Sequence, residues 1–262
     1  MRLLPVKEIV DGVYLLDEFG GTNCYLVVGS EKALLIDCGT GFADLKGTVE
    51  SLTALPVEVI ATHGHVDHIG GAGAFEKIYI HKDDTGFINK IQFSLPARKL
   101  FTAMNGAAKS QGVKLSDVRK GKYRTKFIPI DGSFSLDLGN REIKIKHTPG
   151  HTKGSIAVID ETDKIIFSGD NVCDALWLHL VGSLSIEEWL PSAQWLYEQS
   201  KEYRVFWGHR NAELTSDFIL QVISWGKEIM AFSKKNAFPS RTKQYPETKD
   251  GILYKTGRVF KK

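Results

Sequence analysis

The chain has 262 residues, of which 42% are hydrophobic and 25% charged. These proportions are typical of a globular protein with a substantial core, and the length suits one large domain or two small ones. The formal net charge of +3 is too small to indicate a polyanionic partner. Composition therefore gives no reason to expect nucleic-acid binding.

Three cysteines, Cys24, Cys38 and Cys173, form an odd and sparse set, which argues against a disulfide framework and fits a reducing compartment. The N-terminal residues lack the apolar core of a signal peptide, and no apolar run approaches the roughly 18 residues of a membrane span. We therefore expect a cytoplasmic protein that does not contact a membrane.

The first part of the chain is predicted to form strands. Short apolar runs, separated by glycines, occur at residues 9–10, 13–16, 24–28 and 33–36. Asp37 directly follows the fourth run, and by itself it would be interpreted as a capping residue at an ordinary turn. Apolar residues at helical spacing then predict a helix over residues 42–55, followed by a strand at 57–61.

The stretch from Thr62 to His68, with the sequence Thr-His-Gly-His-Val-Asp-His, is the most informative part of the chain. It follows an apolar strand and precedes glycine-rich residues 69–73, which predicts a loop leading into a short helix. It contains three imidazoles and a carboxylate, and histidine is the commonest metal ligand. The stretch therefore predicts a metal site rather than a polar surface loop that happens to contain histidines.

Residues 77–81 predict another strand, and we interpret His81 as a strand-end residue because no partner pattern accompanies it. Residues 82–126 lack strand alternation and predict a largely helical insertion, which we interpret as a lid. Its candidate substrate contacts are Phe87, Phe93, Phe101 and Met104. A basic run from Lys109 to Lys126 could bind an anionic substrate or nucleic acid, but such runs are more commonly solvated faces.

Strands resume in the second half of the chain. They are predicted over residues 126–130, 133–138, 142–147, 155–159 and 164–167. One following loop contains His151 and another contains Asp170. The stretch from Thr22 to Asp37 resembles the stretch from Thr152 to Asp170, because each contains two strands, a tight turn and a terminal aspartate. This echo predicts a duplicated half-domain with its site where the halves meet.

Two helices and a strand are predicted near the C-terminal end. Ser185 and Glu188 have the spacing of a capping box, and Pro191 either kinks the helix that follows or lies near its start. A strand at 204–207 then leads to His209, and a second helix is predicted over residues 216–230.

The domain organisation follows from these elements. We expect one domain over residues 1–230, containing the insertion at 82–126. Residues 231–262 are polar and interrupted by prolines, so we interpret them as a C-terminal extension without assigning elements.

Seven potential metal ligands share one property, since each lies in a loop just after a predicted strand or at the start of a helix. Because such loops converge at one edge of a sheet-based fold, the seven side chains could meet there. They are His63, His65, Asp67, His68, His151, Asp170 and His209.

This set of residues, in this order over about residues 9–225, resembles the metallo-β-lactamase superfamily. Two accessory motifs resemble it too, Asp37-Cys38-Gly39 after a strand and the Thr-Pro-Gly-His-Thr stretch around His151. The resemblance implies an α/β fold, a four-layer αβ/βα sandwich with two sheets face to face and helices outside, here with an internal helical insertion.

The resemblance also implies two divalent metal ions, position by position. The first would be held by His63, His65 and His151. The second would be held by Asp67, His68 and His209, with Asp170 bridging both. Zinc is the first expectation, and iron and manganese are alternatives, because first-row metals compete for the same nitrogen and oxygen ligands.

The implied chemistry is hydrolysis by a metal-bridging hydroxide, with the metals polarising the substrate oxygen. Asp67 and Asp170 are the expected catalytic carboxylates, Asp67 by orienting the nucleophile or carrying a proton. We expect Asp37 to accept an imidazole N–H and thereby fix that ring's tautomer.

Individual positions narrow the choice among the members of the superfamily. Cysteine-ligated zinc β-lactamases have a cysteine where this chain has Asp170, and Cys173 lies three positions late, so we interpret it as structural or incidental. Flavodiiron proteins have a glutamate where His65 stands. The complete loop with a bridging aspartate is similar to glyoxalase II, the acyl-lactone hydrolases and the transfer-RNA 3′ processing nucleases.

We therefore expect a dinuclear metal-dependent hydrolase that acts on a small-molecule ester, thioester or lactone. One alternative is a persulfide dioxygenase with a single iron held by His63, His151 and Asp170. Another is a phosphodiesterase or nuclease of the same fold. The sequence leaves open whether the protein is a homodimer.

Overall fold

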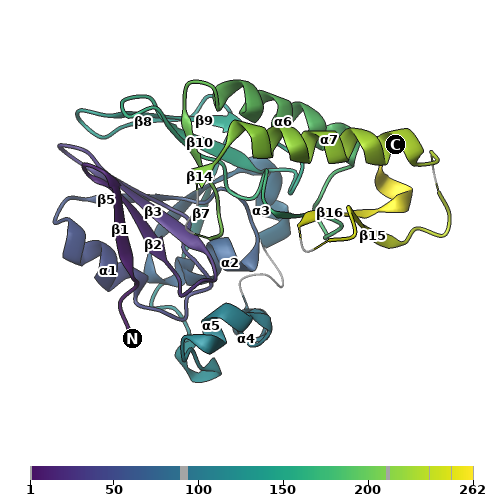
Figure 1. Ribbon diagram of the computed structural model, residues 1–262. Helices are drawn as coiled ribbons and strands as arrows, with labels where there is room; N and C mark the ends of the chain where they lie inside the picture. The colour runs from purple at the N-terminus through teal and green to yellow at the C-terminus, as the bar shows by residue number, and fades with distance from the viewer. Residues whose placement is uncertain (1, 89–93, 211–212, 236, 249, 262) are drawn as a thin grey trace.

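The computed structural model describes residues 2–88, 94–210, 213–235, 237–248 and 250–261 (Figure 1). The first of its sheets has seven strands in chain order; neighbours from β1 to β4 are antiparallel and those from β4 to β7 parallel. The strands are β1 (Val6–Val10), β2 (Val13–Asp17), β3 (Asn23–Val28), β4 (Ala33–Ile36), β5 (Val57–Ile60), β6 (Lys77–His81) and β7 (Lys126–Ile130).

The second sheet has six strands. They are β8 (Ser135–Asp137), β9 (Glu142–His147), β10 (Ile156–Asp160), β11 (Ile165–Phe167), β13 (Arg204–Phe206) and β14 (Glu213–Leu214). Their order across the sheet is β14-β13-β11-β10-β9-β8. A third, three-stranded sheet has the order β12-β16-β15. Its strands are β12 (Ala175–Leu178), β15 (Thr242–Tyr245) and β16 (Gly251–Lys255).

Helices cover the outer faces of the two large sheets (Figure 1). The α-helices are α1 (Leu45–Leu52), α2 (Val66–Ile69), α3 (Lys82–Ile88), α4 (Leu95–Met104), α5 (Gly106–Ser110), α6 (Ile186–Gln199) and α7 (Ser216–Phe232). Short 3₁₀ turns lie at η1 (Gly70–Ala74), η2 (Leu115–Asp117) and η3 (Thr256–Arg258). None of the helices in the described ranges has both the length and the apolar character that crossing a membrane requires.

Capping residues set where the helices begin. α1 begins at Leu45 rather than at residue 42, because the side chain of Asp44 accepts from the backbone N–H of Gly47. α6 begins at Ile186 with both hydrogen bonds of the predicted capping box between Ser185 and Glu188. The helix continues through Pro191.

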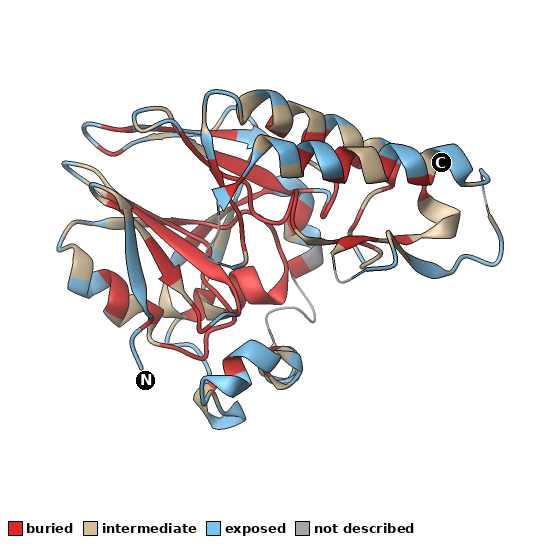
Figure 2. Ribbon diagram, viewed as in Figure 1, coloured by how far each residue is buried: buried red, intermediate tan, exposed pale blue. Residues whose placement is uncertain are grey.

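Strands buried on both faces produce the layers. In β3, Tyr25 and Val27 lie in the cluster between the two large sheets, whereas Cys24 and Leu26 pack in the outer cluster of the first sheet. Because successive side chains of a strand point to opposite faces, one strand contributes to two cores. In β10 the same alternation serves the second sheet. The four-layer αβ/βα sandwich is thereby confirmed, and Figure 2 shows the buried strands between exposed outer surfaces.

The two halves of the sandwich repeat one arrangement. β3 and β4 form an antiparallel pair, and β4 is parallel to β5. β10 and β11 form an antiparallel pair, and β11 is parallel to β13. β4 leads to Asp37 and β11 to Asp170, which is the echo that the sequence predicts. The carboxyl ends of β5, β9 and β13 deliver the remaining ligand loops to the same edge.

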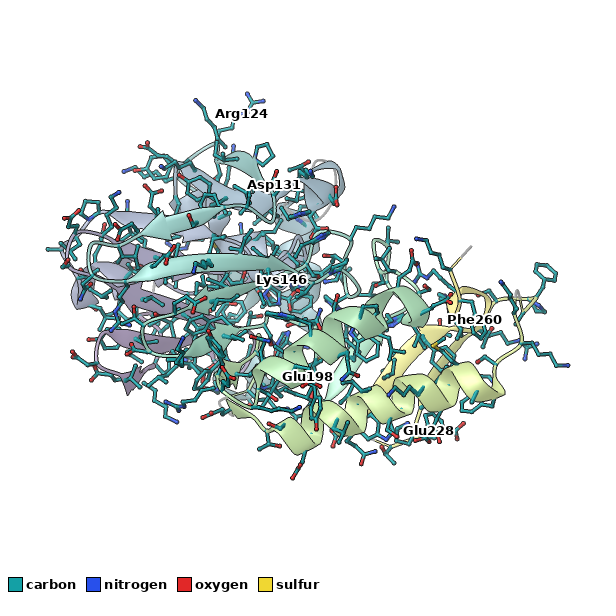
Figure 3. All side chains as sticks on the ribbon, turned by 90° about the horizontal axis from the view of Figure 1, so that it is seen from above. Arg124, Asp131, Lys146, Glu198, Glu228 and Phe260 are labelled. Carbon is teal, nitrogen blue, oxygen red and sulfur yellow. The ribbon has the colours of Figure 1, made fainter. Side chains whose placement is uncertain are left out.

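The tail that the sequence left without elements forms part of the third sheet. β16 pairs in parallel with β12 and in antiparallel with β15. Ile252, Tyr254 and Val259 belong to the same buried cluster as α6 and α7. Figure 3 shows these two helices side by side, with the labelled Phe260 beside the strand pair.

Candidate metal centre

The first ligand loop follows directly from β5. His63 lies three residues after the end of the strand, and His65 occupies the N-cap position of α2. Asp67 and His68 lie on α2 itself, which is buried throughout its four residues. One short loop and one helical turn therefore place four ligand side chains in one region.

Three imidazoles form the first group of possible metal ligands. His63 Nε2 lies 3.0 Å from His65 Nδ1, and His65 Nδ1 lies 2.7 Å from His151 Nε2. All three residues are buried. His151 comes from the loop after β9, so the second sheet completes a group that the first sheet begins.

Two carboxylates and two imidazoles form the second group. His209 Nε2 lies 3.1 Å from Asp170 Oδ2 and 3.5 Å from Asp67 Oδ2. His68 Nε2 lies 3.7 Å from Asp67 Oδ2 and 3.5 Å from Asp170 Oδ1. The structure thus brings together all seven side chains that the sequence singled out.

Asp170 lies between the two groups. Its Oδ2 atom is 3.1 Å from His209 Nε2 and 3.7 Å from His151 Nε2. The close packing here requires glycine at position 208, because a Cβ there would lie 2.3 Å from Asp170 Oδ1 and 2.6 Å from His68 Cε1. This explains the Gly-His pair that follows β13.

Hydrogen bonds to the outer nitrogens hold four of the five imidazoles in orientation. His68 Nδ1 donates to Asp37 Oδ2 at 2.8 Å, the contact that the sequence predicts for Asp37. The other acceptors are Thr62 Oγ1 for His63, Trp177 O for His151 and Gly21 O for His209. Such partners fix the tautomer, so that the other ring nitrogen presents its lone pair to the centre.

The protonation states suit metal binding. Burial lowers the pKa of His65 and of His151 to about 3, and it holds the pKa of His63 well below its usual value. The first group therefore consists of neutral imidazoles, the form that binds metals.

In the second group, interactions between oppositely charged side chains determine the direction of the pKa shifts. Burial opposes protonation of His209, but the Asp170 carboxylate outweighs it and raises the pKa of His209 to about 9. Burial by itself would raise the pKa of Asp170, yet His209 and His68 hold it well below its usual value. A divalent cation bound here would replace the protons that compensate these carboxylates.

Unsatisfied atoms also indicate that metal ions fit the site. His68 Nε2 and Asp170 Oδ1 are buried without a hydrogen-bond partner, and they face each other at 3.5 Å. Buried polar atoms are normally paired, so such exceptions need an explanation. A nitrogen-rich group beside an oxygen-rich one is a donor set suited to first-row metals.

A third cluster, formed by His81, Asp83 and His147, also has ligand atoms close together. The two imidazole rings stack with centroids 3.9 Å apart and an interplanar angle of 15°. Because nitrogen lone pairs lie in the ring plane, stacked rings do not aim them at one point. His147 Nε2 also bonds to Lys153 O at 2.8 Å. This cluster lacks the convergence of the other two, which agrees with the interpretation of His81 as a strand-end residue.

A cavity of about 500 Å³ opens onto both ligand groups. On one side it is lined by His65, Asp67, His151, Asp170 and His209. On the other side it is lined mainly by apolar residues, among them Phe101, Cys173, Trp177, Leu180, Val181 and Trp207. Burial raises the pKa of the Cys173 thiol well above its usual value, so Cys173 is a neutral wall residue rather than a thiolate ligand.

The insertion contributes to this cavity through one of the four predicted contacts. Phe101 of α4 lines it, whereas Met104 is 74% exposed and does not. Phe93 and the side chain of Phe87 lie outside the described residues. The basic run from Lys109 to Lys126 places all seven of its lysines and arginines in exposed positions.

The sequence analysis missed Asp84. Its buried carboxylate accepts from Gly64 N at 2.8 Å, Thr152 Oγ1 at 2.7 Å and Gly154 N at 2.7 Å. It therefore ties the loop of His63 and His65 to the loop of His151. A side chain at position 154 would collide with Asp84, since a Cβ there would lie 2.7 Å from the Asp84 backbone N. The only available signal was a carboxylate a few residues after a predicted strand.

Comparison with known proteins agrees with this fold. The metallo-beta-lactamase superfamily matches residues 17–209 of the chain. The chain therefore belongs to this superfamily and is an enzyme of the metal-dependent hydrolase class, which confirms the resemblance seen in the sequence.

The individual relatives and solved structures share only a minor part of their sequence with this chain. The chain is 28% identical over 202 residues to the acyl-coenzyme A thioesterase MBLAC2 of Bos taurus and to that of Homo sapiens, covering 71% of this chain and 69% of each relative. Among solved structures, a metallo-beta-lactamase family protein of Thermus thermophilus is similar with a TM-score of 0.60 and 17% identity, covering 86% of this chain and 82% of the other. A superfamily protein of Sulfolobus tokodaii has a TM-score of 0.56 and 18% identity, with 86% and 88% covered.

Proposed function

We propose that the chain is a dinuclear metal-dependent hydrolase of a small-molecule thioester. The observation that carries the proposal is the pair of buried ligand groups that share Asp170 and open onto an apolar cavity. The relatives named acyl-coenzyme A thioesterases favour a thioester over an ester or a lactone.

In this proposal the ligands divide as the family resemblance implies. His63, His65 and His151 hold the first metal ion. The second is held by Asp67, His68 and His209, and Asp170 contributes to both. When bound, two such ions, zinc in the first instance, would polarise the thioester carbonyl and activate water at neutral pH.

The chain's own residues orient the reaction. Asp67 Oδ2 lies 3.4 Å from Thr22 Oγ1 and 3.5 Å from His209 Nε2, at the floor of the cavity. From there it accepts the proton of the attacking water and returns it to the departing sulfur. The acyl carbon gains oxygen, the carbon–sulfur bond breaks, and the products are a carboxylate and a thiol.

Two further observations support a cellular compartment and a kind of substrate. All three cysteines are buried and free, which supports a reducing compartment such as the cytoplasm. The small cavity supports a small-molecule substrate rather than a polymer.

The experiment combines metal analysis with turnover. Protein purified without added metal should contain about two equivalents of zinc, or of zinc and iron, and should release thiol from acyl thioesters. Removing the metal with a chelator should abolish thiol release, and adding zinc back should restore it. A single equivalent of iron together with oxygen uptake on a persulfide would overturn the proposal in favour of a persulfide dioxygenase.

A further inference from the structure

The cavity beside the metal ligands has a strongly asymmetric lining. Its charged residues are the ligand carboxylates and Asp174, and no lysine or arginine is among the described residues that line it. Asp174 itself is paired with Arg210. Apart from the ligand groups and the metal ions that they would hold, an anionic ligand group would therefore find no lysine or arginine among the described lining residues to pair with.

The opposite wall is apolar and partly open to solvent. Val181 is 78% exposed and Trp177 is 40% exposed, although both line the cavity. Phe101 of α4 lines it too. Exposed apolar residues that gather around a concave site usually mark a ligand-binding surface.

The wall is attached to the metal ligands through β12. The backbone carbonyl of Trp177 accepts from His151 Nδ1 at 3.0 Å, while the Trp177 side chain lines the cavity. A ligand group that packs against the Trp177 side chain therefore lies beside the first ligand group. β12 is held in place by its parallel pairing with β16.

On these grounds we infer that this cavity binds the hydrophobic acyl chain of the substrate, with Trp177 and Val181 as residues that determine chain-length specificity. The inference rests on the proposed thioester hydrolysis. The thioester carbonyl lies at the ligand groups, and the acyl chain runs along β12. The thiol half, which carries phosphates in coenzyme A, remains outside the cavity because the apolar wall offers those phosphates no lysine or arginine.

The test compares acyl chain lengths in two substrate series. One series is acetyl-, butyryl-, hexanoyl- and octanoyl-coenzyme A, and the other is the same acyl groups on N-acetylcysteamine, which lacks phosphates. We expect kcat/KM of the metal-loaded enzyme to rise with chain length by up to about fourfold per buried methylene. The rise should occur in both series, because the acyl half is the part that the cavity binds.

Variants then locate the effect. Val181→Glu places a charge on the wall at an exposed position, so the fold should tolerate it. It should lower the octanoyl-to-acetyl ratio of kcat/KM about tenfold. Trp177→Ala removes the side chain but keeps the carbonyl that holds His151, and it should lower the same ratio. Leu220→Glu, at an exposed apolar position of α7 away from the cavity, is the matched control and should leave the ratio unchanged.

The outcomes separate the two proposals. Hydrolysis of thioesters with equal kcat/KM for acetyl and octanoyl groups would overturn the acyl-chain inference and leave the proposed function intact. A ratio that Val181→Glu and Trp177→Ala do not change would do the same. Absence of turnover with every thioester by protein holding two metal ions would overturn the proposed function itself, and the inference with it.

Discussion

Two clusters of histidines in this protein differ in what surrounds them. In the metal centre, imidazole nitrogens of His63, His65 and His151 converge from buried side chains, and outer contacts hold the rings. In the cluster of His81 and His147, the rings stack and the neighbouring Asp83 is exposed. Proximity of ligand atoms is common to both. The difference indicates that partners behind the rings, such as those of His63 and His151, help to aim ring nitrogens at one point, so these contacts contribute to the site together with the ligands.

The shared carboxylate should be the most sensitive point of the centre. Asp170→Ala removes the side chain that lies between both groups, so we expect turnover to fall about a hundredfold or more. Metal content should also fall below two equivalents. Steady-state kinetics and elemental analysis measure these effects, with Asp217→Ala, an exposed acid of α7, as the control. A fully metallated and active Asp170→Ala variant would contradict the two-metal assignment.

Substitution of Asp37, the carboxylate that orients the His68 ring, should have the next largest effect. Asp37 accepts from His68 Nδ1 and also from Thr62 N and Thr62 Oγ1. Asp37→Asn disturbs this network, so the affinity for the second metal ion should fall about 10- to 100-fold. Chelator competition measures it, and Asp137→Asn, at the exposed end of β8, serves as the control. If Asp37→Asn binds both metal equivalents as tightly as the unaltered protein, orientation of the His68 ring by Asp37 does not contribute to metal binding.

The link between the ligand loops should have a smaller effect, mainly on stability. Asp84→Asn replaces one of the accepting oxygens by an amide donor that faces N–H or O–H groups, which should cost about 1–3 kcal/mol of unfolding free energy. Denaturant titration of the metal-loaded protein measures the change. The adjacent Asp83→Asn, at an exposed position, should have little effect. Equal stability of the two variants would show that Asp84 does not tie the loops together.

Substitution in the cluster of His81, Asp83 and His147 should have the smallest effect. His147→Ala removes one stacked ring near the protein surface, so metal content should stay at about two equivalents and stability within about 0.5 kcal/mol. Elemental analysis and thermal unfolding test this. Loss of one metal equivalent in His147→Ala would mean that stacked rings can form a third site, and the contrast between the clusters would fail.

Much of the centre was predictable because its ligands are recognisable by residue type. The loop from His63 to His68, Asp170 after β11 and His209 after β13 all follow apolar strands, and the ends of these strands converge at one edge of the sandwich. Apolar runs and helical patterns likewise predicted most strands of the two large sheets and helices α6 and α7, whereas the arrangement into two sheets came from the family resemblance. The helix predicted over residues 42–55 is shorter because Asp44 caps it.

The supporting contacts were not predictable from residue type. His151 and His209 are oriented by the backbone carbonyls of Trp177 and Gly21, and a backbone carbonyl is available at every position of the chain. Asp84 accepts hydrogen bonds from Thr152 and Gly154, which lie 68 and 70 residues further along the chain. The third sheet escaped prediction because its strands are short and because β12 pairs with β16 across a large sequence separation, which local patterns do not encode.

The pairing of β12 with β16 bears on the order in which the enzyme matures during synthesis. The side chains that we propose as metal ligands are all present once residue 209 has left the ribosome. The strand that carries Trp177, however, has no partner until residues 251–255 emerge. A nascent chain could therefore assemble its ligands before the wall behind His151 is held in place. Catalytic competence would then appear late, after the C-terminal strand docks and not when the last ligand emerges.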